Sequence, residues 1–281
     1  MKVICILGPT AVGKSDLALR AAKRFDGEVI NADSMQVYRH LPIGTALPPP
    51  SMLASAPHHL FAFLEPDATP DAGFFARAAA EVIRDVDRRG HVPVLVGGTF
   101  FWVRALLHGL APLQPIPEAV KHEVRKDLAN LGPQALHRRL MDLDPTTAAR
   151  LAPGDSQRIA RALEVAIASG RPLSEHLAQG VQTPLPEAQT LKLVLAMDRA
   201  RLYERINARV VDMIRDGLVD EVRAVLAAGF ARDIRPLRSS SYVPVLEFLD
   251  GRITEARMQA DIAQGHRNYA KRQLTWLRSE S

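Results

Sequence analysis

The first fifteen residues constrain the fold of this chain more than any other stretch. The run VICIL (residues 3–7) is short, apolar and rich in β-branched side chains, which predicts a buried strand. The segment GPTAVGKS follows at once and fits the pattern G-x-x-x-x-G-K-[ST] at Gly8, Gly13, Lys14 and Ser15. Glycines let the backbone approach an anion closely, and a helix beginning near Lys14 points unpaired N–H groups at it. We therefore predict a phosphate-binding loop.

The loop leaves open what carries the phosphate. Lys14 would add a point charge and Ser15 a hydroxyl ligand for Mg²⁺. The pattern is typical of nucleotide triphosphatases, but a common ATPase places an acid after a later apolar strand to organise Mg²⁺. Here VPVLV (92–96) is followed by Gly97-Gly98-Thr99 instead. This argues against a motor-like ATPase and leaves a small-molecule kinase possible.

A carboxylate follows the second predicted strand, EVINA (28–32). At such a position Asp33 can cap a helix or close an Asx turn, which is the commoner use of the residue. Its predicted place beside the phosphate loop favours a further role. Asp33 could orient or deprotonate a nucleophile that attacks near the phosphates.

The order of the segments predicts the fold class. Strand candidates at 28–32, 92–96 and 191–197 are separated by helix-like segments such as 73–89. This alternation predicts an α/β fold with a doubly wound parallel sheet of the P-loop NTPase-like kind. Ligands of such sheets bind beyond the carboxyl ends of the strands. The connector 45–57 has the composition of a surface loop.

The pattern changes between residues 112 and 187, where proline-rich connectors bracket segments of helical period. We predict a helical insertion there, within a catalytic core formed by 1–111 and 188–281. After the fourth strand the core should again be mostly helical, over 199–229 and 252–277.

Composition excludes several classes. With 36 Lys and Arg against 31 Asp and Glu, the net charge of +5 permits a nucleic-acid partner without proving one. The lone cysteine, Cys5, rules out a disulfide framework or a multi-cysteine metal site. No apolar run is long enough to span a bilayer, and the phosphate loop begins too early to leave room for a signal peptide. We expect a cytoplasmic monomer with no membrane partner and no obligate protein partner.

Longer stretches of the sequence resemble the bacterial tRNA dimethylallyltransferases, which prenylate N6 of adenosine-37, next to the anticodon. The phosphate loop alone is shared by many families, whereas DSMQVY, GGTFFWVRALLHGL and KRQLTWLR are far more specific. The matching stretches occur in the family's order and cover nearly the whole chain. They are GPTAVGKS, NADSMQVYRHLPIGTALP, APHHL, VPVLVGGTFFWVRALLHGL, DSQRIARALEV, GLVDEVRAVLAAGF and YAKRQLTWLR.

The resemblance implies that the phosphate is the diphosphate leaving group of dimethylallyl diphosphate, bound with Mg²⁺ as cofactor at Ser15. It implies four catalytic residues: Lys14 and Arg209 on the diphosphate, Asp33 on the N6–H of adenine, and Thr99 at the target nucleotide. The diphosphate would be bound by Gly8, Pro9, Thr10, Ala11, Val12, Gly13, Lys14 and Ser15.

The resemblance also implies a tRNA partner, contacted through its anticodon loop. A stacked adenine must be extruded to reach the diphosphate, and single-stranded loops are where proteins read RNA. The amide of Gln36 could pair bidentately with an adenine edge. A salt-bridged helix face remains an alternative for Arg158 and Arg161. The implied tRNA-contacting residues are Asp33, Ser34, Met35, Gln36, Thr99, Lys121, Gln157, Arg158, Ile159, Ala160 and Arg161.

Two sets of aromatic residues can each be interpreted in two ways, and a set of basic residues lies near the second. Phe100, Phe101 and Trp102 either line a prenyl pocket or pack in the core. Tyr269 and Trp276 are either core anchors or stacking platforms. The basic residues near them could form one wall of an RNA channel; they are His266, Arg267, Lys271, Arg272 and Arg278.

The chain departs from the family pattern at two places. The segment 239–244 (SSSYVP) stands where Gly-Tyr and a basic or polar residue are common, and Gly154 stands where Asn is usual.

The sequence as a whole leaves three hypotheses: tRNA prenyl transfer, phosphoryl transfer from ATP by a small kinase, and RNA binding without turnover. Prenyl transfer is the main prediction, because the resemblance covers nearly the whole chain and neither departure removes Lys14, Ser15, Asp33, Thr99 or Arg209.

Overall fold

The computed structural model describes residues 1–279 and divides the chain into two compact units. The first contains Met1–Leu107 and the chain from Pro184 onward, and the second is His108–Thr183. The expected insertion, 112–187, is therefore placed four residues too late at both ends. The reason is tertiary: Leu110 pairs with Gln182 in an isolated antiparallel bridge, so both connectors belong to the second unit.

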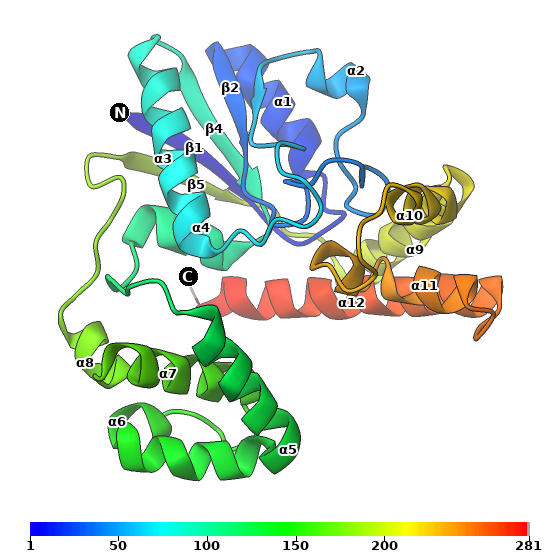
Figure 1. The fold of residues 1–281 in the computed structure, drawn as a ribbon. Helices are drawn as coiled ribbons and strands as arrows, with labels where there is room; N and C mark the ends of the chain where they lie inside the picture. Colours follow the sequence, from blue (N-terminus) through cyan, green and yellow to red (C-terminus); the bar gives the residue numbers. More distant parts are fainter. Residues whose placement is uncertain (280–281) are drawn as a thin grey trace. The chain divides into compact units, whose positions relative to one another are not determined.

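The first unit is built on a five-stranded parallel sheet in the order β3-β2-β4-β1-β5 (Figure 1). This confirms the predicted parallel sheet. The fourth predicted strand begins and ends earlier than 191–197, and the two-residue β3 has no apolar period that would predict it. The strands are β1 (Lys2–Leu7), β2 (Gly27–Asn31), β3 (His58–His59), β4 (Val92–Gly97) and β5 (Gln189–Val194).

Helices of the first half of the chain bury apolar faces against this sheet. Ala18 and Ala22 of α1 pack on Val29, Val94 and Val96. The predicted helix 73–89 is confirmed as α3, and the expected loop 45–57 contains one short helix, α2. The bounds are α1 (Lys14–Phe25), α2 (Pro50–Leu53), α3 (Ala72–Arg88) and α4 (Phe100–His108).

The C-terminal part of the first unit is helical, as predicted. The expected segment 199–229 forms two helices because Gly217, at φ 99°, breaks it. The long α12 lies beside α9 and α11 (Figure 1). Ala270 of α12 and Ile206 of α9 pack on Val12 of the phosphate loop. The elements are α9 (Arg199–Arg215), α10 (Leu218–Ala227), the 3₁₀ turn η1 (Pro236–Arg238), α11 (Val243–Leu249) and α12 (Glu255–Ser279).

The second unit is a small helical bundle. Gly132 interrupts α5 with φ 75°, just before Pro133. Leu140 of α5 packs on Ile159 and Leu163 of α7 in its core. Its helices are α5 (Glu118–Leu143), α6 (Pro145–Ala148), α7 (Ser156–Ser169) and α8 (Leu173–Ala178).

Among the helices of residues 1–279, none combines the length and apolar character needed to cross a membrane.

Candidate active site

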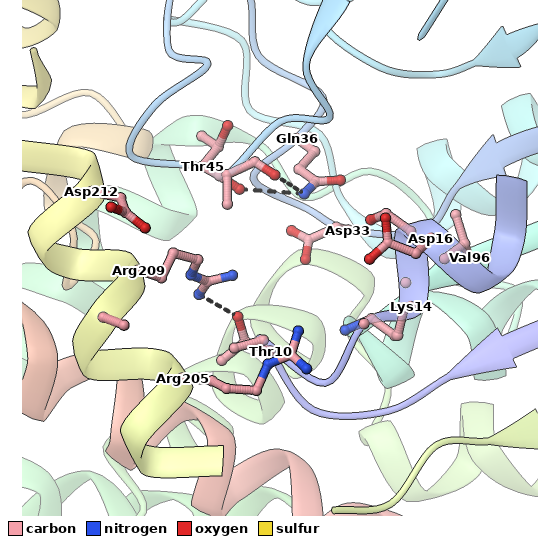
Figure 2. A pocket seen from close by; sticks show the side chains of 16 residues that line it. Thr10, Lys14, Asp16, Asp33, Gln36, Thr45, Val96, Arg205, Arg209 and Asp212 are labelled. Atoms are coloured by element: carbon pink, nitrogen blue, oxygen red, sulfur yellow. Dashed lines mark hydrogen bonds between the residues drawn. The ribbon is translucent and has the colours of Figure 1, made fainter. Parts of the chain in front are cut away.

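A cavity of about 440 Å³ opens in the first unit where the strands of the sheet end (Figure 2). Its floor is the phosphate loop, and Asp33 and Gln36 reach it from the segment after β2. Gly97 reaches it from the end of β4. Thr45 and Ala46 enter from a loop, residues 41–47, and one face of α9 completes the lining.

The glycine pair after β4 is explained by close packing. A Cβ on Gly97 would lie 2.1 Å from the carbonyl oxygen of Ala32, and one on Gly98 would lie 2.3 Å from Nε2 of Gln273. A side chain at position 97 would push the end of β2 away, whereas one at position 98 would displace the amide of Gln273, which donates to the carbonyl of Gly98 at 2.8 Å. The glycines that stand where an ATPase would carry its acid thus keep the end of β4 close to the end of β2.

Three cations surround the floor of the cavity. The Nζ of Lys14 donates to the carbonyl of Pro9 at 2.7 Å, and Nη2 of Arg209 donates to Oγ1 of Thr10 at 2.7 Å. Burial lowers the pKa of Lys14 to about 8; Asp33 opposes this shift, and Arg209 adds to it. Burial likewise lowers the pKa of Arg209 to about 10, again opposed by Asp33. Both side chains are therefore charged at neutral pH and held close together.

Arg205 lies one turn before Arg209 on α9 and was not predicted. It lines the same cavity, and a Cβ on Gly13 would lie 4.0 Å from its Nη2. Within residues 1–279 its guanidinium makes no hydrogen bond or ion pair, so its donors remain available to an anion. The spacing of four residues from Arg209 was the only sequence signal for it.

Asp33 closes the predicted Asx turn and also lines the cavity. Oδ1 accepts the N–H of Met35 at 2.9 Å, which is an Asx turn. The buried Asn31 fixes the backbone by accepting the N–H of Asp33 at 2.8 Å and donating to its carbonyl at 3.0 Å. Oδ2 accepts no hydrogen bond within residues 1–279. Figure 2 shows the carboxylate facing the space between Lys14 and Arg209.

Thr99 and Ser34 join the ends of two strands beside Asp33. Oγ1 of Thr99 accepts the N–H of Ser34 at 2.9 Å and donates to its Oγ at 3.2 Å. This bond connects the segment after β4 to the segment after β2. The structure therefore brings Lys14, Asp33, Thr99 and Arg209 to one end of the sheet, as the sequence interpretation requires.

The amide nitrogen of Gln36 already donates hydrogen bonds within the protein. Its Nε2 donates to the carbonyls of Ala46 at 2.7 Å and Thr45 at 3.4 Å (Figure 2). Bidentate pairing with an adenine edge would require these bonds to be exchanged. Gln36 lines the cavity, and its Oε1 is the acceptor that these two bonds leave unused.

The oxygen atoms of the cavity fit the predicted Mg²⁺. The hydroxyl of Ser15 and the carboxylates of Asp16 and Asp33 line it. Within the described chain, no group of three or more His, Cys, Asp or Glu side chains could hold a metal. Mg²⁺ commonly takes one or two protein oxygens together with substrate phosphates and water, so this sparse set suits it better than a site made only of protein ligands.

The residues predicted in the second unit are mostly on its surface. Lys121 pairs with Glu118 at 2.6 Å, and Arg158 pairs with Asp155 at 2.9 Å. Arg161 lies 3.5 Å from Glu164 and, like Gln157, is exposed. The side chains of Ile159 and Ala160 are buried in the core of the unit. Contact of these last two with tRNA stays a prediction, and it would have to be made through their backbone.

The aromatic residues outside the cavity act mainly in packing. The Trp102 ring stacks on Phe75 at 4.5 Å, and Phe100 on Trp276 at 6.0 Å. Of the three aromatics predicted to line a prenyl pocket or pack in the core, only Phe101 is mostly exposed. None of the three lines the cavity.

His266 does not belong to the expected basic set. Burial, with Arg209 nearby, lowers its pKa to about 3, so it is neutral at pH 7. Its Nε2 lies 2.9 Å from Oγ of Ser241. The Ser-rich departure thus supplies a hydrogen-bond partner for a buried histidine. Gly154, the other departure, precedes Asp155, which caps α7.

Comparisons with known proteins agree with this geometry. The model of the IPP transferase family matches residues 36–280, and that of the isopentenyl transferase family matches residues 1–61. A tRNA dimethylallyltransferase of Halorhodospira halophila is 45% identical, over 99% of this chain and 90% of its own. One of Koribacter versatilis is 44% identical, over 98% of this chain and 89% of its own.

Solved structures give the same result. A tRNA isopentenylpyrophosphate transferase of Staphylococcus epidermidis superposes with a TM-score of 0.68 at 34% identity, covering 98% of this chain and 89% of that one. A eukaryotic dimethylallyltransferase acting on tRNA gives a TM-score of 0.82 at 28% identity, covering 98% and 69%. From its phosphate loop to its last helix, the chain belongs to the tRNA dimethylallyltransferase (IPP transferase) family.

Proposed function

We propose that this protein transfers the dimethylallyl group of dimethylallyl diphosphate to N6 of adenosine-37 in the anticodon loop of tRNA, acting as a monomer with Mg²⁺. One observation carries the proposal: three cations and the carboxylate of Asp33 share one cavity. The cations suit a polyanionic leaving group, and the carboxylate suits an acceptor for the proton of the nucleophile. The comparisons support this reaction rather than the kinase alternative.

The bond changes assign a task to each group. The lone pair of N6 forms a bond to C1 of the dimethylallyl group while the C1–O bond breaks, and its electrons leave on the diphosphate. Lys14, Arg205 and Arg209 would stabilise the negative charge that develops on that oxygen. Oδ2 of Asp33 would take the proton from N6, whose lone pair is otherwise delocalised into the ring. A Mg²⁺ ion at Ser15 would neutralise further charge on the diphosphate.

Thr99 and Gln36 would hold the target base. The Thr99–Ser34 bond fixes the backbone next to Asp33, and Gln36 lines the cavity with Oε1 unused by its two amide bonds. The amine of the adenine could donate to Oγ1 of Thr99 or to Oε1 of Gln36. Extrusion of the base from the anticodon stack would cost a few kcal/mol. The basic residues Lys121, Arg158 and Arg161 of the second unit would contact tRNA phosphates.

The test is nucleoside mass spectrometry of tRNA incubated with the purified protein, Mg²⁺ and dimethylallyl diphosphate. We expect a gain of one five-carbon unit on adenosine-37, with no product when ATP replaces the allylic donor. Transfer of the terminal phosphate of ATP would support the kinase instead. Tight tRNA binding with no modified nucleoside would support the third hypothesis, RNA binding without turnover.

A further inference from the structure

A buried carboxylate outside the cavity holds the loop that forms one of its walls. Glu221 of α10 accepts the backbone N–H of Ile43 at 2.6 Å and that of Gly44 at 2.9 Å. The hydroxyl of Tyr242 donates to the same carboxylate at 2.8 Å. Glu221 and Tyr242 are both buried. Hydrogen bonds to a charged acceptor are about twice as strong as neutral ones, so this is a firm attachment.

The fit between this clamp and the loop is close. A Cβ on Gly44 would lie 2.3 Å from Cζ of Tyr242, so the ring occupies the space that any larger residue would need. Burial raises the pKa of Glu221, and the two loop amides and Tyr242 counteract the shift. Inside the loop, Oγ1 of Thr45 donates to the carbonyl of Leu41 at 2.7 Å. The loop is thus ordered both internally and through α10.

The far side of the same loop faces the cavity. Thr45 and Ala46 line it, and their carbonyls accept the amide of Gln36. Figure 2 shows Thr45 and Gln36 across the cavity from Arg209 and Thr10. A continuous series of hydrogen bonds therefore runs from Glu221, through the backbone of the loop, to the side chain of Gln36.

We propose that Glu221 is a positioning residue for the transfer reaction, holding the 41–47 loop so that Gln36 and the loop seat the target base beside Asp33. This proposal rests on the proposed function. Glu221 does not touch the cavity itself and acts only through the loop. Tyr242, the one residue of segment 239–244 shared with the family's Gly-Tyr pattern, completes the clamp. The Ser-rich departure therefore leaves this attachment in place.

The main test replaces Glu221 by Gln, which keeps the shape but presents an amide donor to one of the two loop N–H groups. A displacement of about 1 Å in a catalytic geometry can lower the rate about 10²-fold, and we expect a fall in kcat of that order. The affinity for dimethylallyl diphosphate should stay within about twofold, since Lys14, Arg205 and Arg209 are untouched. Asp220→Asn is the matched control: Asp220 is adjacent, exposed and paired with the exposed Arg223, so its variant should behave as wild type.

Hydrogen exchange separates positioning from general stability. In Glu221→Gln the amides of Ile43 and Gly44 should exchange at least about tenfold faster, while those of β1 and β4 stay protected. Equal loss of protection in the sheet would overturn the proposal, as would a kcat within about twofold of wild type. Hydrogen exchange needs no turnover, so it tests the attachment of the loop to Glu221 independently of the reaction. If the wild-type protein formed no prenylated tRNA, the proposed function alone would fail.

A second variant approaches the loop from the opposite side. Gly44→Ala keeps Glu221 but forces the loop away from the ring of Tyr242. It should reproduce the local rise in exchange and the fall in kcat. A loosened loop with unchanged kcat would overturn the proposal, because the position of the loop would then not matter for the reaction.

Discussion

The two units hold their predicted functional residues in opposite ways. In the first unit Lys14, Asp33, Thr99 and Arg209 converge at one end of the sheet, and each makes a hydrogen bond that fixes it. In the second unit the predicted basic residues lie on the surface, each paired with an acid three residues away along its helix.

This difference predicts that the two units contribute to different steps, one to the reaction and the other to tRNA binding. Converged and partly buried groups can stabilise charge at a defined point, because the site is preorganised and poorly screened. Exposed ion pairs contribute little stability each, but their cations can exchange partners for RNA phosphates. Reaction rate should therefore depend on the first unit, and the salt dependence of tRNA binding on the second.

The largest effect should come from Asp33. Asp33→Asn keeps an oxygen for the N–H of Met35 but removes the basic oxygen, and loss of a general base lowers rates about 10²- to 10⁴-fold. We expect the rate constant of single-turnover assays to fall by this factor, with tRNA affinity nearly unchanged. Asp33→Ala should lose as much rate and also some thermal stability, since it loses the turn. Wild-type rates in Asp33→Asn would exclude Asp33 as the base.

Arg209 and Arg205 come next. Arg209→Ala should lower kcat about 10²- to 10³-fold, the usual cost of one donor on a developing anion. Arg205 is more exposed and better screened, so Arg205→Ala should cost about tenfold, mainly in affinity for dimethylallyl diphosphate. Arg201→Ala, one further turn along α9 and outside the cavity, is the control. Equal effects for Arg205 and Arg201 would remove Arg205 from the site.

The pKa of Lys14 gives a pH dependence. The ammonium form binds the diphosphate, so the affinity of the free protein should fall as pH rises through about 8. Between about 8 and the ordinary value of 10.5 the unfolded chain binds more protons than the folded one, and the free energy of unfolding attributable to Lys14 should rise with pH. Calorimetric titration with an unreactive thiolo analogue of the donor measures the first effect. Lys14→Met should bind weakly with a flat profile, and a flat wild-type profile up to about pH 9.5 would contradict the assignment.

The sequence predicted the part of the fold that depends on local pattern. The strand, phosphate loop and helix at the N-terminus follow from apolar period and glycine spacing, and the parallel sheet follows from their alternation. The strand β3 was missed because His58–His59 has neither length nor apolar character. The unit boundaries were missed because the pairing of Leu110 with Gln182 is not a local property.

The residues of the candidate site also divide into those that the sequence predicted and those that it did not. Lys14, Asp33 and Thr99 could be predicted because parallel strands bring their carboxyl ends to one edge. Arg209 came only through the family resemblance. Arg205 and Glu221 were not found, because they lie on helices about two hundred residues along the chain from the phosphate loop, Arg205 lining the cavity and Glu221 contacting only the loop beside it. Their contribution depends on how α9 and α10 pack, which periodicity does not encode.

The smallest effect should come from the second unit. In the double variant Arg158→Ala with Arg161→Ala, tRNA affinity at physiological salt should fall a few-fold, and the slope of log affinity against log salt should become shallower by about 1 to 2. Stability should change little, because both arginines are exposed and a pair with one exposed partner is screened by solvent.

At saturating tRNA the same double variant should keep the wild-type kcat, because neither arginine belongs to the cavity. Arg171→Ala is a suitable control, since Arg171 is an exposed arginine of the same unit, is paired with Glu175 and lies outside the predicted contact. A lower kcat at saturation would give the second unit a part in the chemical step. An unchanged salt slope would instead leave Arg158 and Arg161 as an ordinary salt-bridged helix face, and all recognition of tRNA phosphates would have to come from elsewhere in the chain.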